Sequence, residues 1–68
     1  MFESEFDERT AANMEIALRL ACQRLPADKH DHDTRKFIAE RIIDAARQGR
    51  TSLTELTAAG VRALHQLG

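Results

Sequence analysis

Apolar residues recur at steps of three and four along three stretches of the chain, which is the spacing of amphipathic helices. The three stretches lie at about residues 5–25, 34–48 and 53–67. Pro26 and Gly49 separate them, and both residue types commonly end helices. No stretch alternates apolar and polar residues as a strand does. We therefore expect an all-α fold of three short helices in one domain, residues 1–68, with residues 1–4 as a candidate disordered end.

Polar residues at the edges of these stretches predict where each helix begins and ends. The expected N-terminal caps are Ser4 or Asp7 for the first helix, Asp33 or alternatively Asp31 for the second, and Ser52 for the third. Glu55 follows Ser52 by three residues, which is the spacing of a capping box. Gly49 is expected to end the second helix in a left-handed conformation.

The regular apolar positions form one inner stripe on each helix, which predicts the core. These positions are Met14, Ala17, Leu18, Ala21, Leu25, Ile38, Ile42, Ala45, Ala46, Leu53, Leu56, Gly60, Leu64 and Leu67. Gly60 is unusual, because glycine in a helix interior costs about 1 kcal/mol relative to alanine. Two readings of Gly60 stay open: another helix approaches closely there, or the chain tolerates one weak position.

Some large apolar residues fall outside the inner stripes. They are Phe6, Ile16 and Leu20 in the first stretch, and Phe37 and Ile43 in the second. Isolated exposed apolar residues are normal in soluble proteins. However, a chain of 68 residues has a thin core and commonly needs a disulfide, a metal or a partner. We therefore expect these five residues to form a second packing face, most naturally the interface of a homodimer or a larger helical bundle.

Composition narrows the protein classes that remain. The net charge of −1 gives no overall attraction to nucleic acid or to an anionic membrane. No apolar run approaches the roughly 18 residues of a membrane span, and the acidic start of the chain lacks the features of a signal peptide. Cys22 is the single cysteine, which excludes an internal disulfide and fits a reducing compartment. We expect a cytoplasmic protein.

The segment KHDHD at residues 29–33 contains the most suggestive polar side chains. His30 and His32 are candidate zinc ligands, but a structural zinc site normally needs four ligands and the chain offers few others. The likeness of His32–Asp33 to the His-Asp doublet of metal-dependent phosphohydrolases is accidental, because those enzymes need further ligands on longer helices. Helix capping by an aspartate explains the segment more simply. We expect no bound metal and no cofactor.

Enzymatic chemistry has no further support in the sequence. Cys22 has no histidine near it in the sequence to activate its thiol, and Thr51 and Ser52 have no evident general base beside them. The alternative function is weak nucleic-acid binding by the arginine-rich second helix. Against it, Glu40 and Asp44 interleave with those arginines, and the chain has no Trp or Tyr for base stacking.

The segments NMEIALRLACQRLP (13–26), HDTRKFIAERIIDAARQG (32–49) and the following RTSL resemble a group of short helical proteins from alphaproteobacteria. The resemblance covers everything after the acidic N-terminus. It implies the helical fold, but the group has no assigned activity, so it carries over no site residue. In that group the segment before the second helix is richer in glycine, so KHDHD departs from it. The expected function is a small non-enzymatic protein-interaction or regulatory module.

Overall fold

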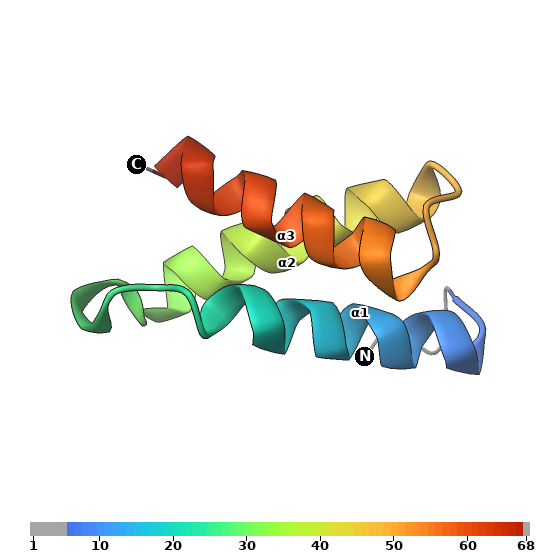
Figure 1. The fold of residues 1–68 in the computed structure, drawn as a ribbon, viewed down its shortest axis with the longest axis horizontal. Coiled ribbons are helices and arrows are strands. Elements are labelled where there is room, and N and C mark those ends of the chain that lie inside the picture. The colour runs from blue at the N-terminus through green and yellow to red at the C-terminus, as the bar shows by residue number, and fades with distance from the viewer. Residues whose placement is uncertain (1–5, 68) are drawn as a thin grey trace.

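The computed structural model describes residues 6–67, except for the side chain of residue 67. These residues form three α-helices and one short 3-10 turn: α1 (Glu8–Cys22), η1 (Ala27–Lys29), α2 (His32–Arg47) and α3 (Leu53–Leu67). Each α-helix packs against the other two. Figure 1 shows α1 and α3 running in one direction, with α2 behind them running in the other. The expected all-α fold of three packed helices is confirmed.

Helix α1 is shorter at both ends than the sequence predicts. Its N-cap is Asp7, whose carboxylate accepts a hydrogen bond of 3.1 Å from the Thr10 amide. Ser4, the other predicted cap, lies outside the described residues, as do residues 1–4 in general. At the far end the amides of Arg24 and Leu25 bond to carbonyls three residues back, so the last turn tightens and stops before Pro26. The helix therefore ends at Cys22 and not near residue 25.

The prediction that Asp33 caps the second helix is wrong, because Asp31 does so. The Asp31 carboxylate accepts from the Thr34 amide at 2.9 Å, and α2 begins at His32. The reason lies in the preceding connection. The 3-10 turn η1 absorbs the residues after Pro26, which leaves Asp31 as the extended residue from which the helix starts. Asp33 is then in the first turn, where its negative charge favourably meets the helix dipole.

Gly49 ends α2 in a left-handed conformation, as the sequence predicts. Gly49 has φ of 93°, and its amide bonds to the Ala46 carbonyl while the Arg50 amide bonds to the Ala45 carbonyl. This pair of bonds is a Schellman motif, which satisfies carbonyls at the helix end. After this turn the Asn13 side chain donates to the Thr51 carbonyl at 3.1 Å, which ties α1 to the connection.

At the start of α3 the serine half of the predicted capping box is present, and the Glu55 carboxylate bonds to the Ser52 hydroxyl. The Glu55 amide donates to the Ser52 hydroxyl oxygen at 3.2 Å, and that hydroxyl donates to the Glu55 carboxylate at 3.0 Å. The Leu56 amide bonds to the Ser52 carbonyl, so the helix starts as the spacing predicts.

The core lies between the three helices and is made largely of small side chains. Its largest fully buried members are Met14, Ile38, Ile42 and Leu56, and alanines supply much of the rest. Small residues let the helices approach closely. The clearest case is Gly60, where an added Cβ would lie 2.9 Å from the Cβ of Ala21 and 3.3 Å from Cδ1 of Ile42. Of the two readings of Gly60, the structure favours close helix approach.

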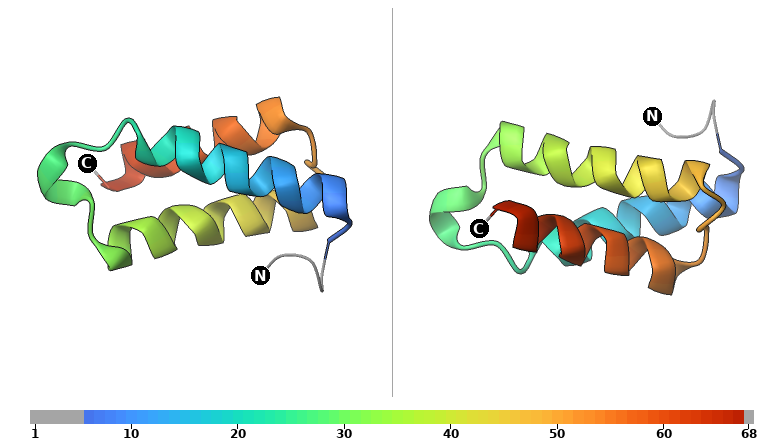
Figure 2. Two further views of the ribbon diagram at one scale, coloured as in Figure 1. Left: turned by 90° about the horizontal axis from the view of Figure 1, so that it is seen from below. Right: turned by 90° about the horizontal axis from the view of Figure 1, so that it is seen from above.

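The two views in Figure 2 show the helices side by side, with η1 and its flanking residues at one end and the α2–α3 connection at the other. Over the part of the chain that the structure describes, no helix has the length and apolar character to cross a membrane.

Candidate functional site

The outer side of α1 carries two of the most exposed large apolar side chains. Ile16 is 40% exposed and Leu20 is 38% exposed, and they lie one helical turn apart. Leu53, at the start of α3, is 37% exposed and borders the same hollow as Asn13, which precedes Ile16 by one turn of α1. We call Ile16, Leu20 and Leu53 the outer apolar strip.

The other residues expected on a second packing face are placed differently. Phe6, Phe37 and Ile43 are each partly buried and pack against the core of their own chain. The apolar spacing predicts Leu53 on the inner stripe, but Leu53 lies in the first turn of α3 and is exposed. Helical spacing cannot separate these cases, because burial at a helix end depends on how far the neighbouring helix extends. Of the five candidates, Ile16 and Leu20 are the two that remain exposed.

The KHDHD segment forms the end of the connection into α2. Nε2 of His30 lies 3.1 Å from the Leu25 carbonyl oxygen, and because a carbonyl only accepts, this nitrogen carries the proton. The bond ties the connection back to the end of α1. His32 is the first residue of α2 and is exposed. Within residues 6–67, no three His, Cys, Asp or Glu side chains come together in a group that could hold a metal ion.

A long hollow follows the junction of α1 and α2, and we call it the α1–α2 groove. One part has a volume of about 700 Å³ and is lined by Glu15, Leu18, His32, Arg35, Lys36, Ala39, Glu40 and Ile43. The adjoining part, of about 450 Å³, lies toward η1 and is lined by Glu15, Leu18, Arg19, Cys22, Gln23, His30 and Arg35. The two parts share Glu15, Leu18 and Arg35, so they form one continuous surface.

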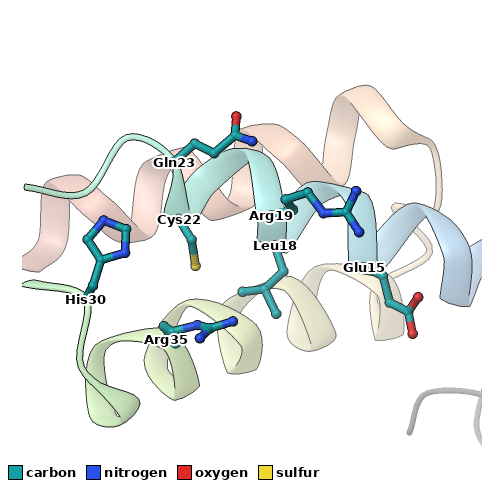
Figure 3. Close-up of a pocket in the computed structure, with 7 residues that line it drawn as sticks. All are labelled: Glu15, Leu18, Arg19, Cys22, Gln23, His30 and Arg35. Atoms are coloured by element: carbon teal, nitrogen blue, oxygen red, sulfur yellow. The ribbon is translucent and has the colours of Figure 1, made fainter. Parts of the chain in front are cut away.

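Figure 3 shows how side chains from α1, α2 and the connection meet in the part near η1. The Cys22 sulfur points from α1 toward α2, and His30 lies beside it at the end of the groove. Sequence reasoning found no histidine near Cys22, because the two residues are eight positions apart and the turn after Pro26 brings them to the same hollow. Cys22 is 9% exposed and is a free thiol. It fills a small core position, as its place on the inner flank of the helix indicates.

The arginines of α2 do not form one basic face. Arg41 makes a salt bridge of 2.6 Å with Asp44, and its guanidinium carbon lies 5.8 Å from the centre of the Phe37 ring. Arg35 and Lys36 lie on the other side of the helix, at the α1–α2 groove. The basic charge that a nucleic acid would need is therefore divided between two surfaces of α2.

The two aspartate caps, Asp7 and Asp31, should make the stability of the fold depend on pH in the acidic range. Hydrogen bonding with the Thr34 side chain, and next with its amide, lowers the pKa of Asp31 below its ordinary 3.8, and Thr10 does the same for Asp7. A lowered folded-state pKa stabilises the fold above the unfolded value, and this contribution is lost as pH falls through the folded value. We expect the melting temperature to fall as the pH is lowered from about 5 to about 2.

The control for this acid effect is the double variant Asp7→Asn/Asp31→Asn. Asparagine still caps a helix but does not titrate. Thermal melts followed by circular dichroism should show a flatter acid limb in the variant than in the wild type. Equal losses in both proteins would mean that other carboxylates cause the acid sensitivity.

Comparison with protein family models, with curated proteins and with solved structures finds no match to this chain.

Proposed function

We propose that the chain is a small non-enzymatic protein-interaction module that forms a homodimer through the outer apolar strip. The observation that carries the proposal is the pair Ile16 and Leu20, which lie one turn apart and stay exposed in the folded chain. A water-exposed pair of this size on one helix side gains free energy when covered, at roughly 25 cal/mol for each Å² of apolar surface.

The small core supports the need for a partner. Few large side chains are fully buried, and the alanines around them contribute little apolar area each. A domain of this size is close to the lower limit for folding alone. Covering the outer apolar strip with a second copy adds apolar burial without adding chain length.

A two-fold symmetric arrangement suits the outer apolar strip. If two copies of α1 pack antiparallel about a point between Ile16 and Leu20, each Ile16 meets the Leu20 of the second copy. A stable interface buries about 600 Å² or more on each partner, roughly an eighth of the 4703 Å² surface of this chain. Two side chains alone cannot supply that area, so the contact extends toward α3, where Leu53 is exposed.

The single buried thiol of Cys22 is compatible with the cytoplasm, which we propose as the compartment. An interaction role is favoured over nucleic-acid binding because Arg41 is engaged by Asp44 and lies on another surface of α2 than Arg35 and Lys36.

The proposal is tested by the mass of the protein in solution. Sedimentation velocity on the wild type should give twice the 7.7 kDa mass of one chain at high micromolar concentration. The variant Ile16→Asp/Leu20→Asp should sediment as a single chain, because each copy would bury two carboxylates without partners in the dimer. Ala58→Asp, at an exposed position of α3, is the matched control and should remain dimeric.

Two results would contradict the proposal. A wild type that stays at the mass of one chain removes the homodimer. A dimer that survives Ile16→Asp/Leu20→Asp shows that a surface other than the outer apolar strip holds the copies together.

A further inference from the structure

The α1–α2 groove combines an apolar floor with unevenly placed cations. Its middle is formed by Leu18 from α1 and by Ala39 and Ile43 from α2, all of them partly exposed. Most of the lining surface in this part comes from apolar atoms. Small-molecule sites occur between the helices of bundles and are lined mainly by apolar side chains with a few polar groups.

Three cationic side chains border the groove. Arg35 borders both parts of the hollow, Lys36 borders the larger part and Arg19 the part near η1. The ion pair between Arg41 and Asp44 lies outside this groove. Arg19, Arg35 and Lys36 form no ion pair with a carboxylate among the described residues. Figure 3 shows Arg35 on α2 and Arg19 on α1, both extending away from His30 toward the side where Glu15 lies.

The acidic side chains of the groove make its two ends differ in charge. Glu15 lies one turn before Arg19 on α1, and Glu40 lies one turn after Lys36 on α2. Because α1 and α2 run in opposite directions, both acids lie farther from η1 than the cations do. An anionic group is therefore attracted at the η1 end and repelled at the other end, while the floor beyond the cations is apolar.

We propose that the α1–α2 groove binds an amphipathic monoanion, a molecule with one carboxylate and a single unbranched alkyl chain. The carboxylate lies beside Arg35, which borders both parts of the groove, while Arg19 and Lys36 each add positive charge along it. Arginine offers a planar pair of donors that matches a carboxylate, and lysine adds a point charge. The alkyl chain lies over Leu18, Ala39 and Ile43 toward the acidic end, where a second anionic group would be disfavoured.

This site is independent of the proposed dimer. The side of α1 that lines the groove carries Glu15 and Leu18, whereas Ile16 and Leu20 lie on a different side of the same helix. The second copy and the amphipathic anion can therefore be bound at the same time. A failure of either proposal leaves the other standing.

The experiment is a titration of the full chain with decanoate, below the concentration at which decanoate forms micelles. Two-dimensional amide NMR should show saturable shifts concentrated at groove residues, including Leu18, Arg35 and Ile43. Decyltrimethylammonium has the same alkyl chain with the opposite charge and should bind at least fivefold more weakly. Shifts centred on Ile16 and Leu20, shifts spread over all three helices, or equal binding of both probes would overturn the proposal.

Substitutions at Arg35 test whether the carboxylate of decanoate lies beside that side chain. Arg35→Glu should weaken decanoate binding at least fivefold, since it replaces an attractive charge with a repulsive one. Arg62→Glu makes the same change on the exposed surface of α3 and should leave binding unaltered. Circular dichroism checks that each variant folds, and Arg35→Gln replaces Arg35→Glu if that variant does not. Equal weakening in the Arg35 variant and in Arg62→Glu would show that net charge alone attracts the probe, which would overturn the site.

Discussion

Replacing Gly60 with leucine is expected to destabilise the fold by about 3 kcal/mol or more, because overpacking a closely packed site moves the surrounding helices. A Cβ at this position already lies 2.9 Å from the Cβ of Ala21, closer than real Cβ atoms approach. The Ala21 methyl group is fixed to the backbone of α1, so it cannot rotate away. Ile42 closes the other side at 3.3 Å. The additional carbons of leucine have no space unless α3 separates from α1 and α2.

Alanine at Gly60 is the more informative substitution, because two effects oppose each other. The better helix propensity of alanine stabilises by about 1 kcal/mol. The contact with Ala21 costs about 1–3 kcal/mol, since one methyl group must displace a helix. We expect a net loss between zero and about 2 kcal/mol.

A double-mutant cycle separates the contact from the propensity. Ala21→Gly should cost about 1 kcal/mol alone through its helix propensity. Gly60→Ala/Ala21→Gly transfers the methyl group from α1 to α3 and removes the clash. Urea melts give the free energy of unfolding of each variant. The double variant should be more stable, by about 1 kcal/mol or more, than adding the two single losses would give. Additive effects, or a Gly60→Leu variant as stable as the wild type, would show that α1 and α3 do not touch at this point.

The features that sequence reasoning predicted well are those whose signals are local. The three helices follow from apolar spacing, and Asp7, Gly49 and the Ser52–Glu55 pair each act on residues within a few positions of themselves. Such interactions depend on the backbone of one segment, so the segment's own sequence determines them. Gly60 was also identified as unusual, although two explanations remained until the neighbouring helices were placed.

Local sequence does not decide whether Asp31 or Asp33 is the N-cap of α2. Both residues are good caps, and the apolar periodicity begins too late to decide between them. The decision comes from the 3-10 turn η1 and from the His30 ring, which bonds back to the Leu25 carbonyl and fixes the length of the connection. Those interactions depend on how α1 ends, and tertiary packing sets that end.

Predictions that require two helices at once were the least secure. Whether Phe37 or Ile43 is exposed depends on what α1 and α3 place against α2, and both residues turned out to pack on the core. The α1–α2 groove has no signature in the sequence for the same reason. Its floor and its cations come from residues that are far apart along the chain. Ile16 and Leu20 could be identified because they lie clearly away from the inner stripe of their own helix.

Replacing Ile42 with alanine should cost about 2–5 kcal/mol of folding free energy, because the variant loses buried apolar surface and leaves a cavity. Ile42 is fully buried and lies against Gly60 at the centre of the three helices. A domain of 68 residues has a total stability of roughly 3–10 kcal/mol, so this loss removes a large part of it. The melting temperature should fall by about 10 °C or more.

Ile16→Ala is the matched control, since it deletes the same atoms from a side chain that is 40% exposed. Its cost within one chain should stay below about 1 kcal/mol, because most of the apolar surface lost there was already in contact with water. If two copies associate through Ile16, however, stability also depends on protein concentration. Thermal melts at several concentrations then distinguish the two roles. Ile42→Ala should lower the melting temperature at every concentration, whereas Ile16→Ala should mainly reduce its rise with concentration. Similar losses from both substitutions at low concentration would contradict the assignment of Ile42 to the core and Ile16 to the surface.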